Sequence, residues 1–205
     1  MCRVVESRRE RKKQQVRRQL AEAAIKLFSE QGYEGTTVAQ IAAAADVATK
    51  TFFNYVPSKE HAVFADARRN AEIPLRVIAD RRSGEAVTDL LLRMYEEMRA
   101  DYMSEGVERG DRELMGTYAQ LLVNEPVLQA RALHMTFKLQ QEIADGLLAA
   151  YPDELDPITA AAVVGAMAGG AQSAALKSME LGEPEERFWA AMRRGVEIGL
   201  RGLPG

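Results

Sequence analysis

Seven consecutive residues, 49–55 with the sequence TKTFFNY, carry side chains that suit contacts with a nucleic acid. A lysine can pair with guanine or meet a phosphate, an asparagine amide can pair with adenine, and hydroxyl groups can donate to either kind of acceptor. The outward or flanking positions of a helix over this segment are Thr49, Lys50, Thr51, Phe53, Asn54 and Tyr55. These six residues are candidate contacts with base edges and phosphates.

The apolar residues of the same stretch indicate which side of this helix faces inward. Val47, Phe52 and Val56 lie at near-helical spacing, so we expect them to pack against the protein. Pro57 ends the helix, because the residue before a proline is pushed out of the α region.

A second short helix is predicted just before this one. Thr37 and Gln40 have the spacing of a capping box, with a hydroxyl at the N-cap and an amide three residues later. One apolar stripe then follows at Val38, Ile41, Ala42 and Ala45. Asp46 is expected in the turn, because aspartate tolerates the left-handed backbone better than most residues. Two short helices joined by a tight turn are the layout of a helix-turn-helix, and we call residues 37–56 the reader segment.

Residues on both sides of the reader segment add candidate phosphate contacts. Ser58 is expected to cap the following helix. Lys59 lies in the first turn of that helix, where a phosphate would be favourable because helix N-termini bind anions. Thr36 and Thr37 stand at the start of the first reader helix. Both could donate to a phosphate, and Thr37 could also serve as a cap alone.

At these residues the chain resembles the DNA-binding domain of the tetracycline-repressor (TetR) family. The positions that match the family's pattern are Thr37, Val38, Ile41, Ala42, Ala45, Val47, Thr51, Tyr55, Ser58, Lys59 and Glu60. The resemblance implies an all-α fold of about nine helices. Residues 1–57 would form a three-helix DNA-binding domain with the helix-turn-helix, and residues 58–205 a helical domain for ligand binding and dimerisation.

Three positions depart from the family's pattern. Ala48 stands where serine is usual, so the second reader helix loses a side-chain cap worth about 1 kcal/mol, unless Thr49 shifts the cap by one residue. Phe53 stands where tyrosine is common, and a phenolic phosphate donor is therefore missing. Val56 replaces a common phenylalanine and still serves as core.

Several of the candidate contacts have a second interpretation. Lys50 could read guanine or touch a phosphate, which is the commoner use of a lysine. Asn54 could pair with adenine or remain a solvated amide. Tyr55 could contact a phosphate or pack, half-buried, on the first helix.

The first twenty residues carry a cluster of positive charge, with eight basic and two acidic side chains. The net charge is +6 over residues 1–20 and +4 over residues 1–60, whereas the whole chain has −3, so residues 61–205 carry −7. A basic head on an acidic body suits a protein that turns one end toward DNA. A solubilising tail is the alternative. We expect this arm to contact phosphates and leave its insertion into the minor groove open.

Composition argues against several other classes of protein. The single cysteine, Cys2, allows no intramolecular disulfide, which fits a reducing cytoplasm. We find no secretory signal, and no apolar run that approaches the roughly 20 residues of a membrane span. An enzyme is improbable, because the chain lacks a phosphate-binding glycine loop, a nucleophile elbow and metal-ligand spacing. We therefore expect no catalytic residue, no metal and no cofactor.

Helical patterns dominate the rest of the chain. A first helix ends at Gly32, near the position where glycine is favoured after a helix. A connecting helix is expected over residues 58–73, with a kink or break near Pro74. Further helices are predicted over residues 85–103, 111–123, 126–150, 157–181 and 185–201.

The penultimate helix is rich in alanine and glycine, with Gly165, Gly169 and Gly170 within six positions. Because glycine costs about 1 kcal/mol in a helix, the three suggest either close backbone approach or room for another group. The resemblance implies that the last two helices pair with their symmetry mates in a homodimer. Two reader helices on a palindromic site also require a two-fold axis.

The resemblance further implies a pocket for a hydrophobic effector among the central helices. Our candidate lining residues are Met98, Met115, Tyr118, His134 and Met167, although each of the methionines could simply be core. The segment around Asn124–Arg131 resembles a branch of the family that includes binders of long acyl chains or acyl-CoA.

We therefore expect a cytoplasmic, ligand-responsive regulator. As a homodimer, it would repress transcription from a palindromic operator until a hydrophobic molecule shifts the connecting helix. A ligand-independent architectural DNA-binding protein is the alternative. The operator, the effector and the choice between repression and activation do not follow from the sequence.

Overall fold

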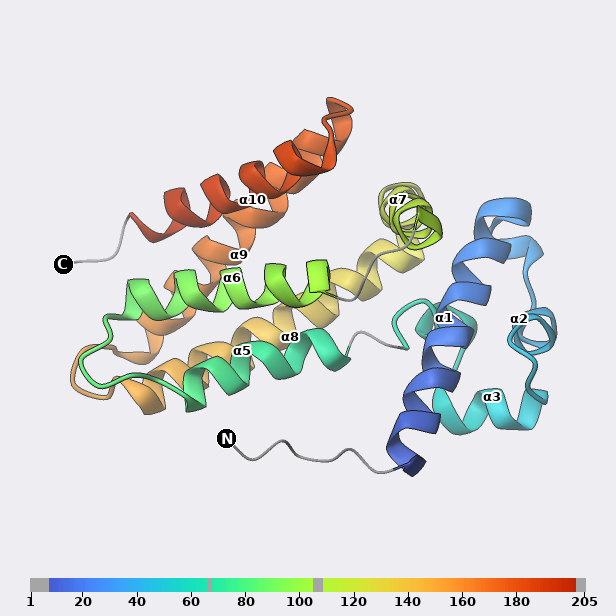
Figure 1. The fold of residues 1–205 in the computed structure, drawn as a ribbon, viewed down its shortest axis with the longest axis horizontal. Coiled ribbons are helices and arrows are strands. Elements are labelled where there is room, and N and C mark those ends of the chain that lie inside the picture. Colours follow the sequence, from blue (N-terminus) through green and yellow to red (C-terminus); the bar gives the residue numbers. More distant parts are fainter. Residues whose placement is uncertain (1–7, 66–67, 105–108, 202–205) are drawn as a thin grey trace. The chain divides into compact units, whose positions relative to one another are not determined.

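The computed structural model describes residues 8–65, 68–104 and 109–201, and all regular structure within these ranges is helical. The all-α prediction is therefore confirmed. The described helices are α1 (Arg8–Gly35), α2 (Val38–Ala44), α3 (Thr49–Tyr55), α4 (Lys59–Ala62), α5 (Arg68–Ala79), α6 (Val87–Ser104), α7 (Arg109–Asn124), α8 (Pro126–Ala150), α9 (Pro157–Glu180) and α10 (Glu185–Leu200) (Figure 1).

The contacts within the chain divide it into two compact units. The first comprises Met1–Arg69 with Val107–His134, and the second comprises Asn70–Gly106 with Met135–Gly205. The boundary predicted at residue 57 marks the end of the helix-turn-helix pattern. By contacts, the unit that holds the reader segment also includes α4, α7 and the beginning of α8.

The first unit is built around α1, α2 and α3. Leu20, Phe28, Ile41 and Phe52 are at most 2% exposed and form its centre. Burying each of these large apolar side chains contributes about 1.5–3 kcal/mol. Helix α2 contacts both α1 and α3, and so joins the two reader helices to α1.

Local sequence signals set the ends of these helices as predicted. Gly32 has φ 77° and interrupts the helical backbone of α1. Thr37 and Gln40 form both hydrogen bonds of the capping box at the start of α2. Asp46 has φ 52°, which confirms the left-handed turn between α2 and α3.

The connecting helix differs from the prediction of one helix over residues 58–73. It is divided into α4 and α5, and α5 continues through Pro74 without a break. Proline inside a helix removes one hydrogen bond and costs about 3 kcal/mol. Ile73, Val77 and Ile78 on the same helix are buried, and their burial offsets that cost.

The second unit has a single apolar core that draws on α5, α6, α8, α9 and α10. Its fully buried members include Val77, Leu90, Leu147, Tyr151 and Val164. The Tyr151 hydroxyl donates to the backbone oxygen of Glu85 at 2.9 Å, so the buried phenol is satisfied.

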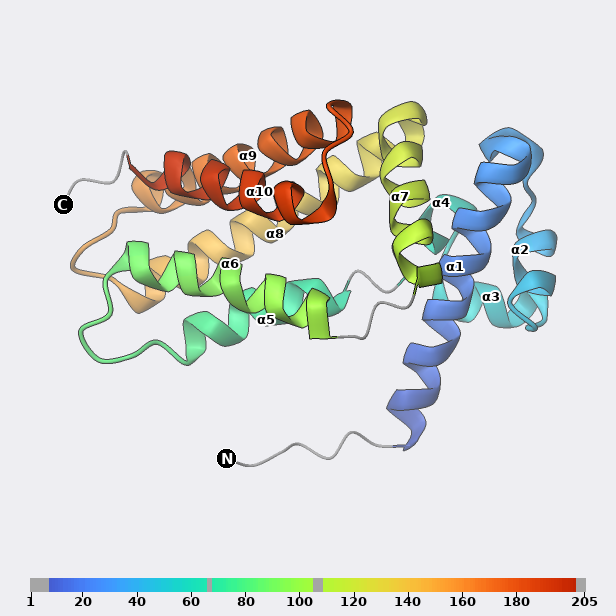
Figure 2. The ribbon, with the colours of Figure 1, turned by 45° about the horizontal axis from the view of Figure 1, so that its top comes forward.

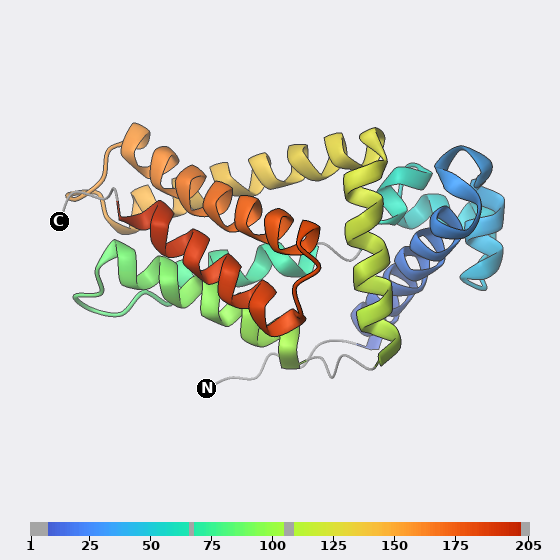
Figure 3. The same ribbon diagram turned by 90° about the horizontal axis from the view of Figure 1, so that it is seen from above.

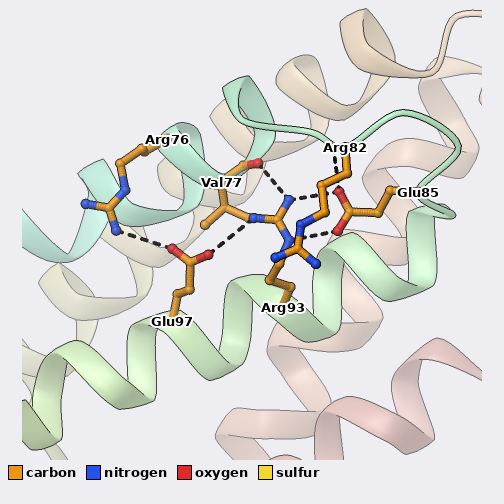
Figure 4. Close-up of polar contacts among 6 residues, drawn as sticks. All are labelled: Arg76, Val77, Arg82, Glu85, Arg93 and Glu97. Atoms are coloured by element: carbon orange, nitrogen blue, oxygen red, sulfur yellow. Dashed lines mark hydrogen bonds and ion pairs between the residues drawn. The ribbon is translucent and has the colours of Figure 1, made fainter. Parts of the chain in front are cut away.

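A polar cluster fastens the loop between α5 and α6 (Figure 4). Arg93 donates from Nε and Nη2 to the two carboxylate oxygens of Glu85 at 2.7 and 2.8 Å. It also reaches Glu97 at 3.2 Å and the backbone oxygen of Val77 at 3.3 Å. One guanidinium thereby joins the end of α5, the loop and α6.

Helices α9 and α10 lie side by side along their lengths (Figures 2 and 3). Gly170 touches the backbone of Gly195, whereas nothing lies within 4 Å of a Cβ added at Gly165 or Gly169. The glycines expected to permit close approach therefore divide into two groups. Gly170 packs inside the subunit, and Gly169 is exposed.

The expectation that no uninterrupted apolar run approaches a membrane span is compatible with α9, whose apolar residues are interrupted by threonine, glycine, glutamine and serine. Among the described residues, α9 is the one helix that length and composition alone would allow to cross a membrane. One such helix is weak evidence for a membrane, because core helices of soluble proteins have the same composition. Close packing against α10 explains Gly170 and Ala166 of α9, which meet the backbone at Gly195 and Gly199.

Candidate nucleic-acid interface

Helix α3 separates its side chains into an exposed and a buried face. Phe52 is fully buried and Val56, which follows the helix, is 5% exposed. Thr51 and Tyr55 are half-buried at the edge of the exposed face. The exposed side chains are Thr49, Lys50, Phe53 and Asn54. All six predicted contact residues of α3 therefore lie on or beside one accessible surface.

The N-terminus of α3 has no side-chain cap. Ala48 occupies the N-cap with φ −69° and ψ 149°, and no side chain bonds to the first turn. Because alanine replaces the usual serine at position 48, the second reader helix lacks a side-chain cap, as predicted. Thr49 does not take over the cap. The free amides at this end can bond only to water or to another molecule.

Phe53 presents the largest apolar group of this surface. Its side chain is 55% exposed, and its ring meets Phe52 edge-on at 5.3 Å between centroids. Since Phe53 has no hydroxyl, it can offer a DNA molecule only apolar contact, for example with a thymine methyl.

The two threonines before α2 have different surroundings. Thr37 is exposed, and its hydroxyl donates to Gln40 Oε1 at 2.8 Å while accepting from the Gln40 amide. Thr36 is 1% exposed, and its hydroxyl donates to the backbone oxygen of Gly32 at 2.8 Å. Thr36 therefore does not join the accessible surface, which corrects its assignment as a phosphate contact. The Thr36 hydroxyl is not available to a phosphate because it bonds to a backbone oxygen near the end of α1.

Lys59 is engaged within the protein. Its ammonium donates to the backbone oxygens of Tyr33 at 2.6 Å and Thr36 at 3.1 Å, and lies 4.0 Å from the centre of the Tyr33 ring. Sequence reasoning missed Tyr33 altogether. The signal available was an aromatic residue directly after Gly32, the glycine that interrupts α1.

Tyr33 and the start of α4 are joined by a second set of polar contacts. The Tyr33 hydroxyl donates to Glu60 Oε2 at 3.2 Å. Burial, followed by the charge of Glu60, raises the pKa of Tyr33 to about 12. Ser58 Oγ lies 2.6 Å from Nδ1 of His61, so the expected cap of α4 bonds to a side chain instead of the backbone.

The basic arm is partly described. Arg9, Arg11 and Lys12 are exposed on the first turns of α1 and can meet phosphates. Arg3 lies outside the described residues, as does the part of the arm for which minor-groove insertion was left open. Arg18, further along α1, pairs with Glu22 at 2.6 Å.

The five candidate ligand residues are not brought together at one described cavity. Met98 and Met167 belong to the core of the second unit, where Met167 is 8% exposed. Tyr118 and His134 belong to the first unit. Tyr118 packs edge-on against Phe64 and burial raises its pKa to about 12, while His134 is exposed. The side chain of Met115 lies outside the described residues.

The comparisons with known proteins place this surface in a family. Residues 20–65 match the sequence profile of "Bacterial regulatory proteins, tetR family", and this range includes the whole reader segment. This match indicates the tetR family.

A curated relative supports this identification beyond the reader segment. The HTH-type transcriptional regulator TcmR of Streptomyces glaucescens is 30% identical over 148 residues. That match covers 72% of this chain and 66% of TcmR, about two thirds of the relative's length. The chain belongs to the tetR family. Members are DNA-binding transcriptional regulators and not enzymes, so the chain is a DNA-binding regulator of this family.

Solved structures of tetR-family regulators share the fold. A transcription regulator from Shewanella sp. PV-4 has a TM-score of 0.57 and 21% identity, covering 92% of this chain and 97% of its own. The FadR repressor of Thermus thermophilus, solved with lauroyl-CoA, has a TM-score of 0.53 and 23% identity, covering 92% and 95%. At these identities the similarity shows the fold alone.

Proposed function

We propose that this tetR-family regulator binds a palindromic operator as a homodimer, represses transcription and is released by a hydrophobic effector in the cytoplasm. The observation that carries the proposal is the exposed face of α3, whose hydroxyl, ammonium and amide groups lie beside uncapped backbone amides. A face of this chemistry matches the donors and acceptors of a major groove.

The proposed contacts divide by role. Base reading is assigned to Thr49, Lys50, Thr51 and Asn54, with Phe53 as an apolar neighbour. Tyr55 at the edge of the same face and Thr37 at the start of α2 are assigned to phosphates, together with the basic arm. Phosphate contacts position the protein, and base contacts specify the sequence.

The proposed dimer uses α9 and α10. A stripe of small or apolar side chains stays exposed on α9 at helical spacing: Ala162, Ala166, Gly169, Ser173 and Leu176. Ile198 on α10 is 54% exposed, and Ile158 at the start of α9 is 81% exposed. Small residues allow a partner's helices to approach closely, and the exposed apolar groups would be buried there.

The proposed effector is an apolar molecule, with a long acyl chain or acyl-CoA as our first candidate. Adaptable methionines, Met98 and Met167, lie in the core of the second unit. A tetR-family repressor of the same fold has been solved with lauroyl-CoA. Effector binding would reduce operator affinity only if the effector binds one conformation of the dimer more tightly than the other.

Selection of binding sites from random DNA tests the first part of the proposal. The full-length protein should select a palindrome, with half-sites about one helical turn apart. Lys50→Ala should weaken binding to the selected site more than to random DNA if Lys50 reads a base, or equally if it meets a phosphate. Lys138→Ala, an exposed lysine on α8, is the matched control. Failure to select any sequence would refute sequence-specific binding.

Two further measurements test the dimer and the effector. Gly169→Arg should yield monomers in sedimentation, because the arginine would occupy the space that the partner's helices need. The single subunit has room for a side chain there, so its own fold should tolerate the substitution. Gln141→Arg on the exposed side of α8 is its control.

Thermal-shift measurements with lauroyl-CoA and free fatty acids test the effector. No shift with any apolar ligand would favour a ligand-independent architectural protein.

A further inference from the structure

Lys59 stands at a point where the two ends of the reader segment meet. Residues 33–36 lead directly into α2, and Lys59 follows α3 after Pro57 and Ser58. The contacts of the Lys59 ammonium with the Tyr33 and Thr36 carbonyl oxygens, at 2.6 and 3.1 Å, join these ends. The reader segment between them is therefore a closed loop with both flanks fixed.

The partners of Lys59 suit a cation. After Gly32 interrupts α1, the Tyr33 carbonyl accepts from the Thr36 amide at 3.3 Å and also from the Lys59 ammonium. The C-terminal end of a helix carries partial negative charge, so a cation is favourable there. The face of the Tyr33 ring, 4.0 Å from Nζ, adds a cation–π contact.

Tyr33 links this turn to α4 a second time, through Glu60. The phenol donates to Glu60 Oε2 at 3.2 Å, on the residue that follows Lys59. One aromatic side chain thus holds the ammonium over its ring and the carboxylate at its hydroxyl. Helices α1 and α4 are in contact within this unit (Figure 2).

We propose that Lys59 is a positioning residue of the DNA interface: it clamps the carbonyl end of α1 to the start of α4, and does not bind phosphate. By fixing both flanks, the clamp limits the motion of α2 and α3 and holds the exposed face of α3 in its binding geometry. This inference rests on the proposed DNA binding by α3, but the clamp can be tested without DNA.

The salt dependence of operator binding separates a clamp from a phosphate contact. Each lost phosphate contact lowers the slope of log Kobs against log salt concentration by about 0.9. Lys59→Met keeps the alkyl chain and removes the charge, so we expect several-fold weaker binding at every salt concentration with an unchanged slope. A slope reduced by about 0.9 for each lysine would overturn the proposal.

Two companion variants complete the binding measurement. Lys59→Arg should restore most of the affinity, because a guanidinium can donate to both carbonyl groups and stack on the Tyr33 ring. Tyr33→Leu removes the ring and the bond to Glu60, and should weaken binding in the same slope-neutral way. Wild-type affinity in Tyr33→Leu would contradict a clamp built on this residue.

Hydrogen exchange of the free protein provides the readout that needs no DNA. In Lys59→Met, the amides of α2 should exchange faster than in wild type, while those of α9 in the second unit keep their rates. Lys50→Met, which removes an exposed lysine of α3, is the matched control. Unchanged exchange in α2 would overturn the clamp, even if the protein binds its operator as proposed. If no variant binds DNA but α2 exchange responds, the clamp stands and the proposed function fails.

Discussion

Gly170 of α9 and Gly195 of α10 face each other backbone to backbone. A Cβ atom added to either glycine would overlap the carbonyl oxygen of the other. Gly199 meets the backbone of Ala166 in the same way, one turn further along each helix. The helices therefore approach as closely as their backbones allow, and this contact holds together the pair that we assign to dimerisation.

Gly195→Ala should destabilise the protein for this reason. The added methyl meets backbone atoms of α9, which cannot rotate away as a flexible side chain would. Overpacking of this kind typically costs about 1–3 kcal/mol, more than the gain of up to about 1 kcal/mol from the helix propensity of alanine. Urea denaturation at one fixed protein concentration measures the difference.

The control for Gly195→Ala is Gly116→Ala. Gly116 is exposed in α7, and nothing lies within 4 Å of an added Cβ. This variant should match wild type or exceed it by up to about 1 kcal/mol. Equal stability of the two variants would show that α9 and α10 can separate without cost.

Ala48→Ser should stabilise α3. The backbone of Ala48 already has the extended φ and ψ of an N-cap, and no side chain accepts from the first turn. A serine oxygen there could accept from the amide of Lys50 or Thr51, which is worth about 1 kcal/mol. Thermal denaturation should show a raised midpoint. Ala48→Val, which adds bulk without an acceptor, should not raise it, and an equal gain in both variants would exclude capping as the cause.

Local signals in the sequence were sufficient for the ends of most helices. The left-handed turn at Asp46 and the capping box of Thr37 depend on residues at most three positions apart, so the sequence specifies them without knowledge of the fold. The exposed face of α3 followed from the spacing of Phe52 and Val56 for the same reason.

Contacts between distant residues account for what the sequence did not reveal. Thr36 is buried, and its hydroxyl donates to the backbone oxygens of Gly32 at 2.8 Å and Leu27 at 3.3 Å. The role of Lys59 depends on Tyr33, which lies 26 positions earlier in the chain. Pro74 remains helical because the core of the second unit packs around its neighbours. The contacts of Lys59 and the packing around Pro74 have no local pattern in the sequence.

Arg93→Met should lower the urea midpoint at neutral pH far more than Arg76→Met. The side chains of Arg93 and Glu85 are 15% and 7% exposed, and the hydrogen bonds from Arg93 hold the pKa of Glu85 at about 2. Removing Arg93 leaves that carboxylate without its main partner in a poorly hydrated place. Arg76 pairs with Glu97 at 3.4 Å but is 60% exposed, so its loss should change stability by less than about 0.5 kcal/mol. Similar effects of the two substitutions would show that the Glu85 pair contributes no more than a surface pair.

His61 should make the protein less stable as the pH falls through the ordinary range of histidine. Burial, followed by the positive charge of Arg131, lowers the pKa of His61 below 6.5, while Glu60 acts in the opposite direction. Below pH 6.5 the unfolded chain therefore binds a proton that the folded protein resists. Stability is present above that pH and decreases between 6.5 and the folded pKa.

Thermal unfolding at a series of pH values above and below 6.5 measures this dependence. His61→Gln should flatten the decrease, because glutamine can still accept from Ser58 Oγ but takes up no proton. His134→Gln removes the other of the two histidines, which is exposed on α8, and should keep the wild-type pH dependence. If His61→Gln and wild type lose stability in parallel over this range, another group must be responsible and the imidazole beside Arg131 is not resisting protonation.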